Sequence, residues 1–365
     1  MKLTLKKVDK PLLIVFLLLV VFGLIMVYSA SNVVAQYKYD DSFYFFKRQL
    51  IFALIGLLCM ILLTNIDMMN IYKFTTLIFF IGILTLVLVL IPGIGVVRGG
   101  ARSWIGFGSF SFQPAEFSKI TMMLLLAKYL SRYDKDLNKF TNFVFLLSIV
   151  LINFGLIMLQ PDFGTGLVLV VSGILLIFCS QAPLKFFILL LMLGICGIVV
   201  LIISAPYRME RILAYLDPWS DPLGSGFQTI QSLYAISPSG LFGLGFNNSM
   251  QKHFFLPEPQ NDFIFAIVCE EFGLFGAVLL LLCFAFLIIR IVCIAKKQTN
   301  VYYRYVCLGI GLILFTQIFI NIGVVIGLLP VTGITLPIIS YGGSSLLLSM
   351  IMIAIVLNIS RYQED

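Results

Sequence analysis

Long apolar runs separated by short polar segments dominate this chain of 365 residues. A helix needs roughly 20 apolar residues to cross a bilayer, and most of the runs reach that length. A membrane barrel would show short segments of alternating apolar and polar residues instead. We therefore predict an all-α polytopic membrane protein, folded as one domain over residues 1–365 and built as a single bundle of about ten transmembrane helices. The predicted spans are roughly 11–30, 49–66, 73–92, 117–131, 142–160, 163–180, 183–204, 263–289, 304–329 and 342–359.

The composition supports a membrane protein and excludes several other classes. Of all residues, 61% are hydrophobic and only 11% are charged, whereas a soluble globular protein carries about 25% charged residues. The seven cysteines show no CxxC or Cys/His spacing, so we expect neither disulfides nor a structural zinc site. The sequence contains no P-loop, GxSxG or GxGxxG motif. We therefore expect no nucleotide or organic cofactor.

The basic residues predict the orientation in the membrane. Ten spans place both termini on one side, and the segments on that side carry fifteen of the Lys and Arg residues. The segments on the other side are far longer but carry only eight. The positive-inside rule therefore predicts that both termini lie in the cytoplasm. The net charge of +7 then lies mostly on a face that meets anionic lipid, and it does not indicate nucleic-acid binding.

Three polar segments interrupt the apolar pattern on the predicted outer side. They are residues 93–119, the large loop 205–262 between the seventh and eighth spans, and residues 329–345. The loop 205–262 holds six of the thirteen prolines, and the third segment is rich in Gly and Pro. Irregular backbone at membrane depth is tolerated only where it is buried in protein or lines a cavity. We therefore predict that the three segments converge on one outward-facing cavity.

Asp262 ends the large loop and stands directly before the apolar run that begins at Phe263. One interpretation is that Asn261 or Asp262 caps the eighth span, because both residue types are favoured at helix N-termini. The other is catalysis, since a carboxylate beside apolar residues is partly desolvated and its pKa rises towards that of a useful base. The residues alone leave both interpretations open. For Asp162, before the sixth span, capping is the preferred interpretation.

Four further charged residues lie at or inside predicted spans. Glu270 and Glu271 follow Asp262 by about two helical turns, and we favour a structural role in which they pair with a basic group or a serine of a neighbouring helix. Glu116 and Lys119 are three residues apart, so they can neutralise each other on one helix face. Alternatively, Lys119 faces the cavity as a cation for Asp262 or for a phosphate group.

Other residues of the outer segments are candidates for binding phosphate. Arg208 and Arg211 share one face if their segment is helical, and paired guanidinium groups bind phosphate oxygens well. They could equally meet lipid headgroups, and the same alternative holds for Arg102. Trp104 is more often an interfacial anchor than a platform for a ligand.

Five motifs, in order along the chain, carry a resemblance to a known family. They are GARSWIGFGSFSFQPAEFSK, QPDFGTG, YLDPWSDPLGSGFQTIQSLYAISPSGLFGLGF, LPEPQNDFIFAIVCEEFG and GLLPVTGITLPIISYGGSS. Together they resemble the SEDS family of shape, elongation, division and sporulation proteins, over nearly the whole chain. The resemblance implies a multi-pass protein of the bacterial cytoplasmic membrane, a peptidoglycan glycosyltransferase that polymerises lipid II on the outer face of that membrane. The implied partners are a class B penicillin-binding protein acting as transpeptidase and other division or sporulation membrane proteins.

The resemblance also assigns residues. The family's essential aspartate falls on Asp262, its motif lysine on Lys119 and its glutamate pair on Glu270 and Glu271. Its tryptophan falls on Trp104, although this chain reads ARSWIG where the family has Arg and Ser transposed, which weakens the match of Arg102. Asp262 would act as general base while Lys119, Arg208, Arg211 or a divalent ion such as Mg²⁺ or Mn²⁺ stabilises the departing polyprenyl pyrophosphate.

Two functions of other classes remain open at this point. A lipid II flippase would also need a polar cavity in the membrane, although the sequence shows no inverted repeat and its polar groups crowd on one side. A non-catalytic division scaffold would need only its outer surfaces.

Overall fold

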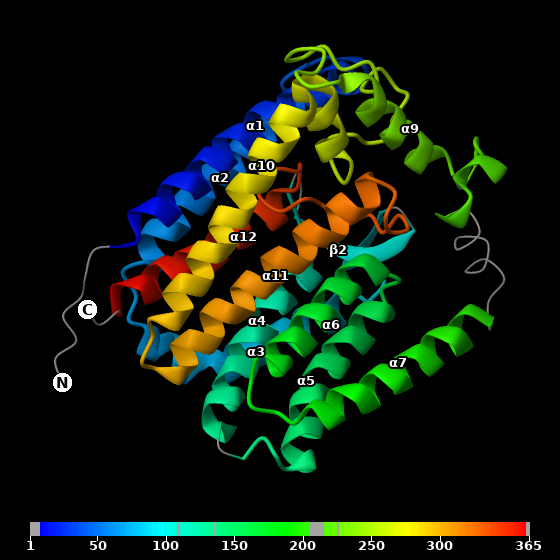
Figure 1. The fold of residues 1–365 in the computed structure, drawn as a ribbon. Helices are drawn as coiled ribbons and strands as arrows, with labels where there is room; N and C mark the ends of the chain where they lie inside the picture. Colours follow the sequence, from blue (N-terminus) through cyan, green and yellow to red (C-terminus); the bar gives the residue numbers. More distant parts are fainter. Residues whose placement is uncertain are drawn as a thin grey trace.

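A computed structural model describes residues 8–98, 100–107, 110–134, 136–203, 215–224 and 226–362. Each of the ten predicted spans coincides with a helix of this part of the chain (Figure 1). The predicted all-α membrane bundle is therefore confirmed. The helices are α1 (Lys10–Tyr39), α2 (Tyr44–Leu63), α3 (Met68–Leu88), α4 (Pro114–Tyr133), α5 (Phe140–Met158), α6 (Phe163–Phe178), α7 (Leu184–Ile203), α10 (Ile264–Lys296), α11 (Val301–Val325) and α12 (Gly343–Ile359).

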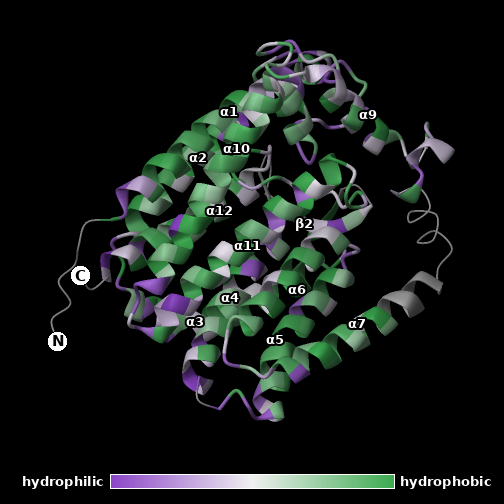
Figure 2. Cartoon of the chain, viewed as in Figure 1, coloured by the Kyte–Doolittle hydropathy of each residue, from purple (hydrophilic) through white to green (hydrophobic). Residues whose placement is uncertain are grey.

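Burial separates central from peripheral helices. Of the most apolar stretch of each helix, 72% is buried in α11 and 78% in α12, whereas only 22% is buried in α2 and in α3. Helix α4 packs against α3, α5, α6 and α11, and most of its residues are buried. The outer helices consist mostly of hydrophobic residues, coloured green in Figure 2. This arrangement fits lipid outside and places the charged residues of α4 in the protein interior.

The first and last helices meet at one end of the bundle. Asp9 caps α1 by accepting a hydrogen bond from the Leu12 amide, and its own amide donates to Ser360 Oγ at 3.0 Å. The Asp9 carboxylate also binds Arg290 of α10 at 2.8 Å. The start of α1 and the end of α12 therefore lie on the same side, as an even number of crossings requires.

A small antiparallel sheet lies between α3 and α4, where no strand was predicted. Its order is β1 (Gly95–Arg98), β2 (Ala101–Phe107) and β3 (Phe110–Phe112), with Val96 opposite Trp104. Ser103 and Ile105 are buried whereas Arg102 and Trp104 are less buried, which is the alternation expected of a half-buried strand. The loop before α10 contributes the short helix α9 (Phe227–Ile236) and the 3₁₀ turns η1 (Pro218–Ser220) and η2 (Ser237–Ser239).

Helix α10 is broken at Gly273, which has φ 65° and ψ −163°. The loop segment 240–245 runs alongside the break and forms backbone hydrogen bonds with the residues on both sides of Gly273. Leu244 and Gly245 donate to the carbonyls of Glu270 and Glu271, both at 2.9 Å, and Leu274 and Phe275 donate to those of Gly240 and Leu241, both at 3.0 Å. The contact requires glycine, because a Cβ on Gly273 would lie 2.4 Å from the Gly243 nitrogen. The break therefore leaves these backbone groups paired.

Candidate functional site

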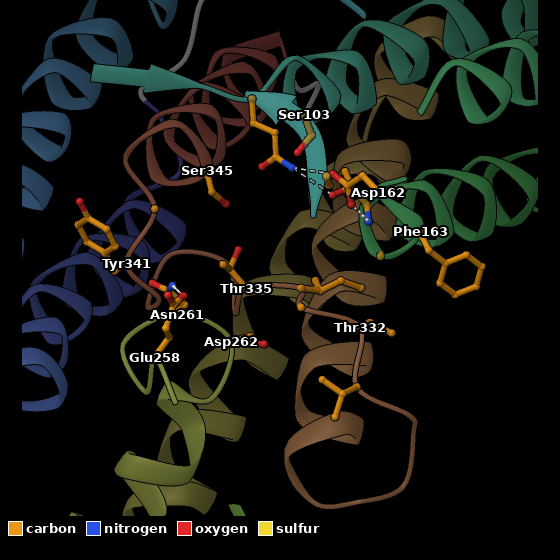
Figure 3. Close-up of a pocket in the computed structure, with 18 of the residues that line it drawn as sticks. Ser103, Asp162, Phe163, Glu258, Asn261, Asp262, Thr332, Thr335, Tyr341 and Ser345 are labelled. Atoms are coloured by element: carbon orange, nitrogen blue, oxygen red, sulfur yellow. Dashed lines mark hydrogen bonds between the residues drawn. The ribbon is translucent and has the colours of Figure 1, made fainter. Parts of the chain in front are cut away.

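One cavity of about 1510 Å³ lies at the end of the bundle where α10 and α12 begin. The three polar segments singled out in the sequence all contribute to its wall, as predicted. Figure 3 shows Ser103 of β2 and Asp162 on one side, and Glu258, Asn261 and Tyr341 on another. The residues used below that line the cavity are Arg48, Trp104, Gln113, Glu116, Lys119, Asp162, Thr165, Glu258, Asn261, Asp262, Gln317, Thr335 and Tyr341.

Asp262 lines this cavity and does not cap the helix that follows it. The N-cap residue of α10 is Phe263, and no side chain accepts a hydrogen bond from the first helical turn. Burial raises the pKa of the Asp262 carboxyl to about 7, its own backbone amide opposes that rise, and the nearby Glu258 carboxylate adds to it. A carboxyl group with a pKa near neutrality is half ionised at physiological pH and can accept a proton.

Asn321 of α11 holds the backbone of Asp262. Its side-chain amide donates to the Asp262 carbonyl at 2.6 Å and to the Ile334 carbonyl at 2.7 Å. Asn321 is only 1% exposed, so these bonds form away from water. The amide therefore ties the loop before α10 to the segment before α12. The sequence analysis missed this residue, although an Asn within the apolar run IFINIG is a signal in itself.

Lys119 and Glu116 form an ion pair in the cavity wall. Lys119 Nζ lies 2.7 Å from Glu116 Oε1 and 2.8 Å from Gln317 Oε1. Lys119 is 1% exposed and Glu116 6% exposed. Gln317 in turn donates to the Thr335 carbonyl at 3.1 Å. Both interpretations of Lys119 are thus compatible with the structure, because its charge is balanced by Glu116 while its side chain borders the cavity.

Asp162 caps α6, as the sequence analysis preferred. Its carboxylate accepts from the Thr165 amide at 3.1 Å and from the Gln113 side chain at 2.8 Å. Gln113 immediately precedes α4, so this bond joins the starts of α4 and α6 at the cavity wall.

The predicted phosphate-binding residues are distributed differently. Trp104 borders the cavity, whereas Arg102 is not among the lining residues and donates a long bond of 3.4 Å to the Leu90 carbonyl. Arg208 and Arg211 lie outside the described residues. Arg48 of α2 also lines the cavity. In the sequence it was only one of the eight basic residues assigned to the outer side, and it was not predicted as a site residue.

Glu270 and Glu271 lie away from the cavity and bind the loop and α1. Ser249 Oγ and the Met250 amide donate to Glu270 at 2.5 and 2.8 Å. Glu271 accepts from Ser29 Oγ at 2.6 Å and lies 3.5 Å from Lys252 Nζ. The partners are a serine of a neighbouring helix and a basic group, which is the kind of pairing that the structural interpretation favoured.

The described residues contain no group of three or more His, Cys, Asp or Glu side chains that could hold a metal ion. At the cavity, Asp262 and Glu258 are close enough to influence each other's charge. Mg²⁺ is commonly bound by one or two carboxylates together with substrate phosphates. These two side chains fit a cation shared with a phosphorylated substrate, but they do not form a complete protein site.

Sequence comparison finds relatives along almost the whole chain. Residues 9–365 match the family model for FtsW, RodA and SpoVE, described as cell cycle protein. Stage V sporulation protein E of Bacillus subtilis (strain 168) is 53% identical over 357 residues, covering 98% of this chain and 98% of its own length. The probable peptidoglycan glycosyltransferase FtsW of Coxiella burnetii is 40% identical over 361 residues, covering 98% and 97%.

Solved structures share the fold. A chain of a peptidoglycan synthase complex, from work on the structural coordination of polymerization and crosslinking, is 30% identical with a TM-score of 0.80 and covers 98% of this chain and 99% of its own. The rod shape determining protein RodA of Thermus thermophilus is 26% identical with a TM-score of 0.71, covering 98% of each chain.

Proposed function

This chain belongs to the FtsW, RodA and SpoVE family of cell cycle proteins, and from that premise we propose that it is a peptidoglycan glycosyltransferase. It polymerises lipid II into glycan strands at the outer face of the cytoplasmic membrane, in cell division or in sporulation. The resemblance inferred from the sequence motifs to the SEDS family is confirmed.

The Asp262 carboxyl group carries the proposal. It borders a cavity large enough for a lipid-linked saccharide, and the pKa of about 7 makes it a usable base at physiological pH. It caps no helix, so helix capping does not account for it.

The reaction joins two saccharides. The 4-hydroxyl oxygen of one sugar attacks C1 of another, the C1–O bond to the polyprenyl pyrophosphate breaks, and the electron pair leaves with the pyrophosphate. Asp262 accepts the hydroxyl proton, an assistance that contributes roughly 10²–10⁴-fold to such reactions. Pyrophosphate is a good leaving group, so a second carboxylic acid of the kind used by inverting glycosidases is not required. Cationic side chains at the cavity stabilise its charge.

Glu258 and Asp262 are the side chains that would hold a divalent cation, and the cation would supply charge neutralisation at the leaving group. The protein residues keep their own tasks. Asp262 holds the proton, Lys119 remains paired with Glu116, and Trp104 presents an aromatic surface to the sugar.

The proposal extends to the setting in the cell. Both termini lie in the cytoplasm, and the cavity opens on the outer side. A class B penicillin-binding protein acts as the transpeptidase partner, by analogy with the peptidoglycan synthase complex that shares this fold. Apolar outer helix faces are available for its membrane span.

Translocation of lipid II without polymerisation is the second candidate. It requires a polar path through the whole bilayer. The described cavity is lined instead by the starts of α2, α4, α6 and α12 and the loops beside them, all at one end of the bundle. This one-ended cavity favours the polymerase.

A polymerase assay tests the proposal. Purified full-length chain is incubated with lipid II and its candidate transpeptidase partner, with and without Mg²⁺ or Mn²⁺. We expect Asp262→Asn and Asp262→Ala to lose roughly 10²–10⁴-fold in rate. The control is Asp41→Asn, which removes a partly exposed carboxylate paired with Lys47. Normal glycan length and yield from both Asp262 variants would refute the catalytic role, and labelled lipid II crossing vesicle membranes without polymer would favour the translocase.

A further inference from the structure

The two cationic side chains of the described cavity wall differ in how their charge is balanced. Lys119 lies 2.7 Å from the carboxylate of Glu116. Arg48 has no carboxylate partner among the residues that the structure describes, although it borders the same cavity. A charged side chain inside a membrane bundle is costly unless another group compensates it. The cavity therefore has a positive charge at Arg48 that forms no ion pair with a carboxylate of the described residues.

Protein contacts nevertheless fix the position of Arg48. Its guanidinium carbon lies 4.6 Å from the centre of the Tyr44 ring, at cation–π distance. It also lies beside the Tyr341 hydroxyl. The neighbouring Gln49 is 1% exposed and binds the turn that carries Tyr341, by donating to the Ser340 carbonyl at 3.0 Å and accepting from the Gly342 amide at 3.1 Å. Arg48 and Tyr341 are therefore held together.

This pair lies at the same end of the cavity as Asp262. The Tyr341 amide donates to the Gln260 carbonyl at 2.8 Å, two residues before Asp262. Figure 3 shows Tyr341 beside Glu258 and Asn261 on one wall. A ligand that reaches Arg48 is therefore also near the carboxyl group to which we assign the proton transfer.

We propose that Arg48 and the Tyr341 hydroxyl form an anion subsite that binds the phosphate oxygens of the lipid-linked substrate. The inference rests on the proposed function and adds a specific recognition site to it. A guanidinium group offers a planar pair of N–H donors that matches two phosphate oxygens, and the phenol adds one O–H donor.

A headgroup phosphate of the surrounding bilayer is the other source of the same chemistry. The adjacent Lys47 provides a contrast, because its side chain is 63% exposed and paired with Asp41 at 2.8 Å. Lys47 is thus the cation that α2 presents to the surroundings, whereas Arg48 borders the cavity. The contrast favours the substrate.

Binding measurements separate the two sources. Full-length protein in phosphatidylcholine nanodiscs is titrated with a polyprenyl diphosphate that carries no sugar and with the corresponding polyprenol. We expect Arg48→Gln to weaken diphosphate binding by about 10- to 100-fold, the range for a lost hydrogen bond to a charged group. Arg48→Lys keeps the charge but loses the planar fork, so it should fall between Arg48→Gln and the wild type. Tyr341→Phe should weaken binding less, and polyprenol binding should not change in any variant.

Lys47→Gln is the matched control and should bind the diphosphate like the wild type. Repeating the titration in phosphatidylglycerol nanodiscs tests the headgroup source. If Arg48 bound anionic headgroups and not the diphosphate, Arg48→Gln would bind the diphosphate as tightly as the wild type in both lipids. This result would overturn the proposal. A thermal unfolding scan of Arg48→Lys and Arg48→Gln detects misfolding, and Arg48→Lys then decides the outcome.

The same measurement separates this inference from the polymerase proposal. Asp262→Asn should retain diphosphate binding while losing polymerisation. If Arg48→Gln bound normally while Asp262→Asn lost activity, the subsite would be wrong and the polymerase proposal would stand. If Asp262→Asn remained fully active while Arg48→Gln lost binding, the subsite would stand alone.

Discussion

Two groups of carboxylates near the start of α10 show opposite ways of placing an acid in this protein. Glu270 and Glu271 are buried and receive hydrogen bonds from Ser29 of α1 and from Ser249 and Met250 of the loop, with Lys252 nearby. Asp262 borders the cavity, and its own amide is the one hydrogen-bond donor assigned to its carboxyl group within the described chain. Carboxylates whose oxygens already accept several hydrogen bonds from the protein stabilise the fold. A carboxyl group that faces a cavity and accepts few such bonds is available to a substrate.

The largest expected effect concerns stability. In Glu271→Gln the buried Lys252, 2% exposed, loses its carboxylate partner. Breaking a buried ion pair costs about 3–5 kcal/mol. Thermal unfolding should show this loss, while protein that remains folded keeps its polymerase activity.

The control for this prediction is Asp262→Asn, which should lose activity but keep its stability. In the wild type, the folded-state pKa of Asp262 is about 7, above the ordinary value for Asp, so the folded state holds the proton more tightly than the unfolded state. Ionisation of Asp262 therefore lowers the stability of the wild-type fold as pH rises towards 7. At pH 8 the Asn variant should therefore be at least as stable as the wild type, and a large loss of stability there would contradict the comparison.

The second prediction is the pH dependence of the rate. A general base acts when deprotonated, and the Asp262 pKa is about 7. The polymerisation rate should therefore rise with pH, level off above about 7 and fall by about tenfold per pH unit below it. Initial rates between pH 5 and 9 test this expectation. A rate that is already flat at pH 5.5 would show that the proton acceptor has an ordinary carboxylate pKa.

A smaller effect is expected at Asn321. Asn321→Ala leaves the Asp262 and Ile334 carbonyls without their donor. Displacement of the base should lower kcat by about tenfold, because small displacements of a reacting group are costly. The control is Asn153→Ala, which removes a buried amide bound to Ser118 instead. Asn153→Ala should lower stability but leave the pH profile of the folded enzyme unchanged, whereas Asn321→Ala should shift that profile. Identical pH profiles in both variants would reduce Asn321 to a structural residue.

The smallest effect is expected at Glu258, whose negative charge adds to the raised pKa of Asp262. Glu258→Gln should lower the midpoint of the pH–rate profile by a fraction of a unit, because burial is the larger cause. The profile of Glu258→Asp, which keeps the charge, should stay near that of the wild type. An upward shift in Glu258→Gln would mean that the two carboxyl groups interact in another way.

Local sequence was sufficient to predict the spans and the segments that form the cavity. Each span is a continuous apolar run, and hydrophobic length alone indicates a membrane helix. Gly- and Pro-rich segments between such runs indicated the cavity for a second local reason, since exposed irregular backbone is excluded from lipid. Asp162 was predicted as a cap because a cap acts on its own helix.

The remaining features depend on residues that are distant in the sequence. The strands near Trp104 are short and separated by glycines, so their alternation was too brief to detect. Arg48 was predicted to lie in a loop before the second span, whereas α2 begins at Tyr44 and includes it. Its side chain contacts Tyr341, which lies nearly 300 positions further along the chain. The role of Asn321 depends on its hydrogen bonds to the carbonyls of Asp262 and Ile334, which local sequence does not reveal. Likewise, the break at Gly273 depends on the distant Gly243.

That break has a mechanical consequence. The part of α10 after Gly273 continues to Lys296 through the apolar layer, while the part before it is tied to α1 and to the loop by the two glutamates. Because segment 240–245 forms backbone hydrogen bonds with both parts, α10 changes course at Gly273 without leaving these groups unpaired. We expect the part after Gly273 to adjust its tilt when the bilayer thins or thickens, while the part before it and the adjoining Asp262 keep their position.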